Sequence, residues 1–149
     1  MAFLEFMPGA LAPDDATPPT WDNSSVVFEA DGSEHKGGWS VYVPADIVSA
    51  SSTTLRIYFI DEGVGTGNVR FSVEYYASSE TSIIGSGAPN IDVTVPNVAG
   101  SVFYTDVDIS AWIPAGTVLL FITLTRDSSD AADTYASDIG LALGRTLEV

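Results

Sequence analysis

The chain has 149 residues, a size typical of one domain, and with 46% hydrophobic and 17% charged residues its composition is globular rather than disordered. Five Lys and Arg against twenty Asp and Glu give a formal net charge of -15, which excludes the clustered basic surface that nucleic-acid binding requires. The absence of cysteine excludes disulfides, thiolate nucleophiles and zinc–thiolate sites.

Residues 1–25 contain Pro8, Pro13, Pro18 and Pro19 and show no regular periodicity, so we interpret them as an extended N-terminal arm. The arm has no basic region and no long apolar stretch, which argues against a secretory signal and a membrane span. Its apolar residues are expected to be covered, either by the chain's own domain or by a neighbouring subunit. These predicted partner-binding residues are Phe3, Leu4, Phe6, Met7, Leu11 and Trp21.

From residue 26 onward, short runs of β-branched and aromatic residues alternate with clusters of Gly, Pro, Asn, Asp and Ser. This pattern predicts one all-β domain over residues 26–149, an antiparallel two-sheet β-sandwich of about eight strands, jelly-roll-like and without a helix. The predicted strands cover residues 26–30, 39–43, 54–60, 68–77, 91–95, 102–109, 117–125 and 139–149.

Three of these strands have informative patterns. Residues 68–77 alternate, so Val69 and Phe71 are predicted to face the core and Arg70 the solvent. The segment TVLLFITLT is apolar on both faces, which predicts either a strand covered on each side or one face turned to a neighbour. The last strand is predicted to have one inward apolar row that Arg145 interrupts.

Side chains suited to acid–base or nucleophilic catalysis are few, since His35 is the only histidine and Lys36 the only lysine. Both lie in DGSEHKGG, which is predicted to be a solvated, glycine-rich turn before a strand. A serine triad built on His35 stays an alternative, but no G-x-S-x-G motif supports it. We therefore expect no enzyme activity and no catalytic residues.

The loop RDSSDAADTYASD is the most distinctive polar segment, because it places Asp127, Asp130, Asp133 and Asp138 within a short span. These oxygens could bind Ca²⁺, although the loop lacks the residue order and central glycine of an EF-hand. The favoured interpretation needs no cofactor. In it, the aspartates cap loop N–H groups and pair with Arg126 or Arg145.

Exposed aromatic residues could form a platform on which sugar rings stack. In a sandwich, however, the tryptophans and the inward tyrosines belong more often to the core. The candidates are Trp21, Trp39, Trp112, Tyr42, Tyr58, Tyr76 and Tyr104.

Three segments together resemble a β-sandwich domain that recurs in structural proteins of tailed bacteriophages, including fibre-like and particle-surface proteins. They are GWSVYVPADI, TLRIYFIDEGVGTGNVRFSVEYYA and LLFITLTRDSSDAADTYASDIGLALG, and the resemblance covers residues 38–145. It depends on the VPAD segment, the GTGNV hairpin and the RD...DAADT...D loop. None of these is a catalytic signature.

Fibre proteins that contain such domains also have repeats and stalks, which this chain lacks. The resemblance therefore implies a capsid decoration or cement protein of the virion, made in the host cytoplasm, that stabilises contacts between capsid subunits. It implies the major capsid protein and copies of the chain itself as partners, commonly as a homotrimer, with no nucleic acid and no membrane. The alternative is a tail-fibre or spike-type module that binds a receptor or glycan.

Overall fold

We describe the chain from a computed structural model, which covers residues 5–6, 12–13, 20–22, 25–30, 32, 34–48 and 52–148, with side chains described between residues 27 and 142. Four of the predicted partner-binding residues of the arm lie outside the described residues, namely Phe3, Leu4, Met7 and Leu11. Phe6 and Trp21 lie in described strands, but their side chains are outside the described part.

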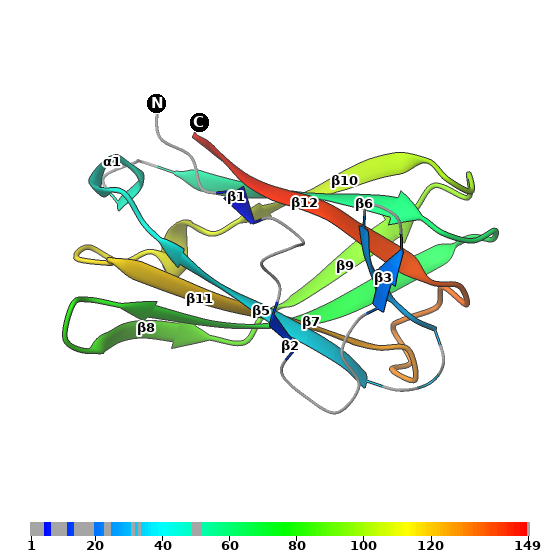
Figure 1. Cartoon of the computed structure of the whole chain (residues 1–149), viewed down its shortest axis with the longest axis horizontal. Coiled ribbons are helices and arrows are strands. Elements are labelled where there is room, and N and C mark those ends of the chain that lie inside the picture. The colour runs from blue at the N-terminus through cyan, green and yellow to red at the C-terminus, as the bar shows by residue number, and fades with distance from the viewer. Residues whose placement is uncertain are drawn as a thin grey trace.

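Two antiparallel sheets face each other and form a sandwich (Figure 1). Sheet A has the strand order β10-β6-β12-β4-β3, with β1 beside β12, and sheet B has the order β2-β5-β11-β7-β8, with β9 beside β7. The predicted fold class is confirmed. The strands are β1 (Glu5–Phe6), β2 (Ala12–Pro13), β3 (Thr20–Asp22), β4 (Ser25–Phe28), β5 (Glu34–Tyr42), β6 (Thr53–Asp61), β7 (Gly67–Ser78), β8 (Ile83–Gly87), β9 (Asn90–Val95), β10 (Val102–Asp108), β11 (Leu119–Asp127) and β12 (Ile139–Glu148).

All eight predicted strands are present, although their ends differ from the predicted ones. Strand β8 was not predicted, because its sequence IIGSG combines two glycines and a serine with only two β-branched residues. The prediction of no helix is wrong. The described residues contain a one-turn helix, α1 (Ala45–Val48), and a 3-10 turn, η2 (Ser110–Trp112), each in a connection between strands.

Strand β5 begins at Glu34, well before the predicted start at Trp39, so His35 and Lys36 lie in a strand and not in a solvated turn. His35 is buried and pairs in register with Arg126 of β11. One of the glycines that suggested a turn, Gly38, instead allows close packing. A Cβ added at Gly38 would lie 3.1 Å from the hydroxyl of Thr123 on the neighbouring strand.

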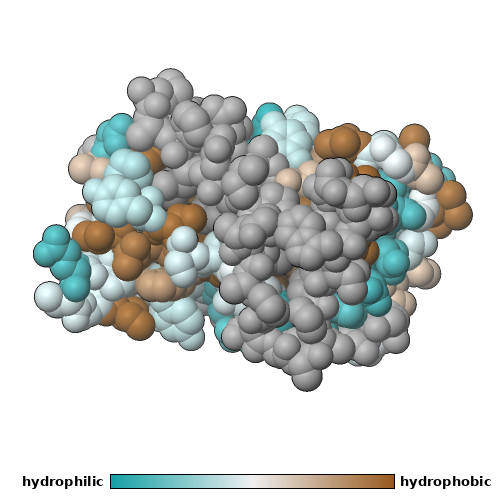
Figure 2. Space-filling model, viewed as in Figure 1, coloured by the Kyte–Doolittle hydropathy of each residue, from teal (hydrophilic) through white to brown (hydrophobic). Residues whose placement is uncertain are grey.

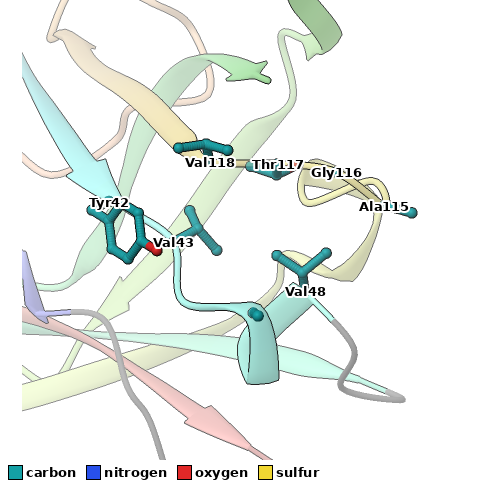
Figure 3. A pocket seen from close by; sticks show the side chains of 8 residues that line it. Tyr42, Val43, Val48, Ala115, Gly116, Thr117 and Val118 are labelled. Atoms are coloured by element: carbon teal, nitrogen blue, oxygen red, sulfur yellow. The ribbon is translucent and has the colours of Figure 1, made fainter. Parts of the chain in front are cut away.

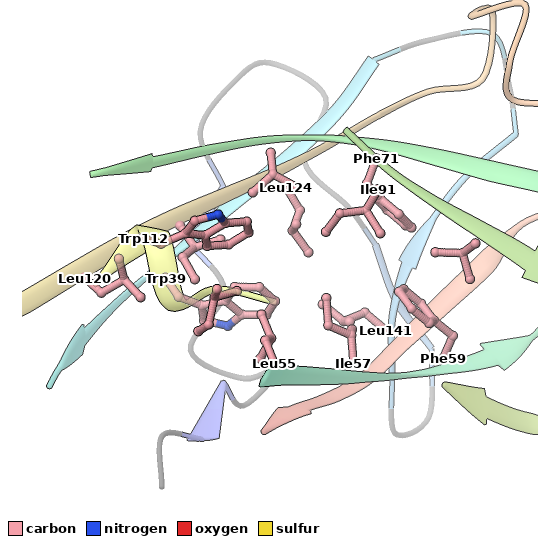
Figure 4. Packing of buried hydrophobic residues seen from close by; sticks show 14 of the residues in the cluster. Trp39, Leu55, Ile57, Phe59, Phe71, Ile91, Trp112, Leu120, Leu124 and Leu141 are labelled. Atoms are coloured by element: carbon pink, nitrogen blue, oxygen red, sulfur yellow. The ribbon is translucent and has the colours of Figure 1, made fainter. Parts of the chain in front are cut away.

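The core lies between the two sheets and is formed mainly by the inward residues of β4, β5, β6, β7, β9, β11 and β12 (Figure 4). Strand β7 shows the predicted alternation, with Val69, Phe71 and Val73 buried. Phe71 stacks on Phe59 of sheet A, with ring centroids 5.5 Å apart, and meets the edge of Phe28 at 5.3 Å. Aromatic contacts therefore join the two sheets directly.

Strand β12 has a register shift that the sequence did not predict. Leu141 pairs with the buried Phe59, whereas Leu143 pairs with Tyr58, the next residue of β6 and one on its outward face. The predicted single inward row is therefore wrong, because an extra residue in one strand exchanges the two faces. Beyond the shift, Arg145 is at an outward register position.

The described pieces of the arm pair with strands of their own domain. β1 pairs with β12 and β3 with β4, both in sheet A, and β2 pairs with β5 at the edge of sheet B. Of the helices in the described part of the chain, none is long and apolar enough to cross a membrane.

Candidate functional site

A hollow of about 390 Å³ opens at the end of the sandwich where α1 lies (Figure 3). The end of β5, helix α1 and the loop before β11 form its walls. The Val43 N–H donates to the Val118 carbonyl at 2.8 Å, which joins two of these walls. The hollow is therefore preformed. Its lining residues are Tyr42, Val43, Ala45, Val48, Ala115, Gly116, Thr117 and Val118.

This hollow continues as apolar surface onto the neighbouring strand β8. A Cβ added at Gly116 would lie 3.9 Å from Cδ1 of Ile84, and Ile83 is 63% exposed. None of the lining residues is charged, although the chain contains twenty acidic residues. Figure 2 shows hydrophobic residues gathered around this end. We call the hollow together with Ile83 and Ile84 the apolar end patch.

The outer face of sheet B carries a second exposed surface on three neighbouring strands. Phe121 of β11 is in register with Tyr76 of β7, and Leu119 of β11 with Tyr42 of β5. All four side chains are exposed, Tyr42 by 66% and Tyr76 by 44%. We call these four residues the aromatic face. The outer side of β11 is thus exposed at Leu119 and Phe121, whereas Thr125 on the same side is buried, so the alternative of a strand covered on each side is wrong for the first part of β11.

Polar groups border the aromatic face. A hollow of about 250 Å³ beside Tyr76 is lined by Glu74, Ser86, Gly87 and Ala88 as well as by the tyrosine itself. The Glu74 carboxylate lies 3.7 Å from the Lys36 ammonium. Ser40 and Ser86 occupy the two ends of the cross-strand row that contains Phe121 and Tyr76. Hydrogen-bonding groups therefore lie next to exposed rings.

The other aromatic candidates fall into two groups. Trp39 and Trp112 are buried in the core, as expected for a sandwich. Tyr104 is 53% exposed on the outer face of sheet A, with its ring centroid 5.9 Å from that of Tyr58. The guanidinium carbon of Arg56 lies 3.9 Å from the centroid of the Tyr104 ring. A cation already occupies that ring face.

Arg56 also makes a two-pronged contact with Asp106, each N···O distance being 2.7 Å. These hydrogen bonds raise the pKa of Arg56 above its usual value and lower that of the Asp106 carboxyl. The outer face of sheet A therefore presents an ion pair, as does the outer face of sheet B, where Arg70 pairs with Asp92.

Arg126, which is wholly buried, organises the aspartate loop. Its Nε and Nη2 donate to the two carboxylate oxygens of Asp133 at 2.8 and 3.1 Å. Nη1 donates to the carbonyls of Phe28 and Ser137, and Nη2 donates also to that of Tyr135. All five N–H groups of the guanidinium therefore have an acceptor. The predicted pairing of a loop aspartate with Arg126 is confirmed.

The other three aspartates of the loop accept hydrogen bonds from backbone N–H groups, as predicted. The pairs are Asp127 with Ser129 (2.9 Å), Asp130 with Ala132 (2.8 Å) and Asp138 with Ala30 (2.7 Å). Within the described ranges, no three or more His, Asp or Glu residues are grouped so that they could hold a metal ion. The calcium alternative gains no support from this loop.

A second buried polar contact lies at the same end of the sandwich. The Tyr135 hydroxyl donates a short hydrogen bond to Oδ1 of Asp61, whose carboxylate also accepts from the N–H groups of Gly63 and Val98. Burial, and then this hydrogen bond, raise the pKa of Tyr135 to about 12. The contact fixes the loop after β6 to the aspartate loop, which indicates a structural role for both.

Comparison with known proteins relates this geometry to other folds. No family model and no curated protein matches the sequence. Among solved structures, the CBM36-1 domain of a multidomain xylanase from the hindgut metagenome of Trinervitermes trinervoides matches with a TM-score of 0.55 and 9% identity, over 99% of this chain and 98% of that chain. The K1 cleaved adhesin domain of Lys-gingipain from Porphyromonas gingivalis W83 matches with a TM-score of 0.51 and 14% identity, over 100% and 99%. The fold is a jelly-roll β-sandwich.

A third structure, of infectious bursal disease virus Gx strain, is less similar, with a TM-score of 0.48 and 11% identity over 97% of this chain and 32% of that chain. At these identities the comparisons show the jelly-roll fold alone. They show no phage-specific family.

The sequence did not identify either exposed surface in full. Tyr42 and Tyr76 were among the candidate aromatics, but Phe121 and Leu119 were not singled out. The sequence feature that could have indicated these two residues was the apolar run on both faces of residues 117–125. No local sequence pattern indicated the end hollow, because its walls come from three separate segments.

Proposed function

We propose that this chain is a structural protein of a phage virion, a decoration protein that binds the capsid surface and stabilises contacts between capsid subunits. It acts without catalysis and needs no cofactor. Its partners are the major capsid protein and further copies of the chain, arranged as a homotrimer.

The apolar end patch is the observation that carries this proposal. A free monomer gains nothing by exposing a preformed apolar hollow with two neighbouring isoleucines, whereas a partner that covers them removes apolar area from water. The gain is roughly 25 cal/mol per Å² of buried apolar surface. With a net charge of -15, the rest of the molecule repels other free copies, so attachment depends on local apolar contact.

The phage resemblance suggests the capsid surface as the partner in this contact, and avidity increases the overall affinity. On a symmetric shell the same weak contact repeats, and linked copies bind far more tightly than one. The arm residues, from Phe3 to Trp21, would add a second apolar contact to each copy.

Cosedimentation with purified particles of the phage that encodes the chain tests the proposal. We expect the wild-type protein to pellet with particles and Ile83→Glu to pellet at least tenfold less, because the new carboxylate must lose its water in the contact. Val102→Glu is the matched control, since Val102 is 64% exposed and lies at the opposite end of the sandwich. Equal pelleting of both variants, or none by the wild type, would contradict the proposal.

A second candidate function is a receptor-binding module that recognises a glycan. The aromatic face of sheet B favours it, because exposed rings beside hydroxyl and carboxylate groups suit the mixed apolar and polar surface of a sugar. The two surfaces share Tyr42, which also lines the end hollow, but Phe121 and Tyr76 lie outside that hollow, so a decoration protein could also present these two rings outward.

A further inference from the structure

We propose that the aromatic face of sheet B binds an uncharged oligosaccharide, with sugar rings stacked on Phe121 and Tyr76. This inference rests on the second candidate function and deepens it by naming the residues and the ligand class. It does not depend on attachment through the apolar end patch.

The arrangement of the rings supports stacking. Phe121 and Tyr76 face each other across neighbouring strands, and strands lie roughly 5 Å apart. Tyr42 and Leu119 form the next row, two residues along the strand or roughly 7 Å away. The face spans three strands and two rows, an area that suits more than one sugar ring. The ligand is therefore an oligosaccharide rather than a single sugar.

The rings are already held in place for binding. Phe121 and Tyr76 stand on strands that pair along most of their length, and their sequence neighbours Leu120, Ile122 and Ala77 are buried in the core. Tyr and Phe side chains also have few rotatable bonds, so little conformational entropy is lost when a ligand covers them. A fixed platform binds more tightly than one that must be ordered.

Hydrogen-bonding groups lie where the hydroxyls of a stacked sugar would reach. The hollow beside Tyr76 presents the Glu74 carboxylate and the Ser86 side chain. Lys36 lies 3.7 Å from Glu74 and orients it across the sheet. Carboxylates accept up to four hydrogen bonds, so Glu74 can keep this ion pair and still accept from a sugar hydroxyl.

The charge of the molecule selects the class of sugar. The aromatic face has no charged residue, and the only carboxylate beside the rings in the lined hollow is Glu74. The chain as a whole carries a net charge of -15, which repels sialic or uronic acids. An uncharged oligosaccharide meets no such repulsion.

Binding to immobilised hexasaccharides tests the inference. The probes are β-linked hexasaccharides of glucose, mannose and galactose, with a sialylated oligosaccharide as the charged comparison. We expect the wild-type protein to bind at least one uncharged probe and to ignore the sialylated one. Phe121→Ala and Tyr76→Ala should each weaken binding about tenfold or more, since loss of a central aromatic contact typically has that effect. Tyr76→Phe, which keeps the ring, should retain most of the binding.

Tyr104→Ala is the matched control, because Tyr104 is similarly exposed but lies on the outer face of sheet A. It should bind like the wild type, and circular dichroism spectra should show that all variants are folded. Equal loss in Tyr104→Ala, or no binding of the wild type to any uncharged probe, would overturn the inference. The inference would also be overturned if purified particles, but not sugar, shielded Tyr76 from chemical modification.

The same variants separate this inference from the attachment proposal. Ile83→Glu should lose particle binding and keep sugar binding. A wild-type protein that decorates particles and binds no uncharged probe would overturn the inference alone.

Discussion

Arg126 and Asp133 form a two-pronged ion pair in which both side chains are wholly buried. The pair joins strand β11 to the loop that follows it, and the remaining guanidinium donors bind the carbonyls of β4 and of that loop. A buried charge without a partner is costly, so this contact determines how the loop end of the sandwich is ordered.

Replacement of Asp133 by Asn should destabilise the protein by about 3–5 kcal/mol, because it leaves the Arg126 charge buried without a counter-charge. Urea unfolding followed by circular dichroism measures this change. Asp92→Asn is the control, since Asp92 pairs with Arg70 on the solvent-exposed face of sheet B and its loss should change stability little. If the two variants lowered the free energy of unfolding equally, burial of the Arg126–Asp133 pair would have no effect on its contribution to stability.

Alkaline pH should destabilise the protein through Tyr135. Its pKa is raised from 10.0 to about 12, so the folded state favours the protonated phenol. This contribution is fully present below pH 10 and is lost as the pH rises through 12. The free energy of unfolding of the wild type should therefore fall across this window. Tyr135→Phe, although less stable at neutral pH, should show a flatter profile, and an unchanged slope would refute the assignment.

Core and surface phenylalanines should differ sharply in their effect on stability. Phe71→Ala removes the ring that packs on Phe59 and Phe28 and should cost about 3–5 kcal/mol. Phe121→Ala removes a ring of the aromatic face that is 36% exposed and should cost only about 1–2 kcal/mol. Thermal and urea unfolding compare the two. A large loss in the Phe121 variant would assign that ring to the fold rather than to binding.

Gly67 should tolerate alanine less well than Gly65. Both have positive φ, +159° and +133°, but a Cβ at Gly67 would lie 2.7 Å from the Thr134 carbonyl oxygen, whereas one at Gly65 meets nothing within 4 Å. Gly67→Ala should therefore cost about 1–3 kcal/mol more, because the backbone of the aspartate loop must move. Equal unfolding midpoints of Gly67→Ala and Gly65→Ala would show that the aspartate loop can move at no cost in stability.

The strand pattern was predictable because alternation is local. Val69, Phe71 and Val73 each follow from their own neighbours in the sequence, and the core burial confirms them. The extra residue in β12 was not predictable, because a register shift depends on the partner strand β6 and not on β12 alone. The true start of β5 was not predictable for the same reason, because Gly38 packs closely against Thr123 of the partner strand β11.

The candidate surfaces were predictable only in part. The loop aspartates were assigned correctly to N–H groups and to Arg126. The contacts of Asp127, Asp130 and Asp133 are close in sequence, whereas Asp138 accepts from the distant N–H of Ala30. The apolar end patch joins residues around Val43, Val118 and Ile84, which only the fold brings together. Tyr76 and Phe121 come from strands far apart in sequence, so their pairing became visible only with the order of sheet B.

The attachment proposal places the chain on a phage capsid, and electron cryomicroscopy of purified particles of the proposed phage tests it most directly. We expect sandwich-shaped density on the capsid surface, with the end that contains α1 against the shell and the outer face of sheet B turned away from it. Particles without this density, or density that places the apolar end patch in solvent, would contradict the proposal.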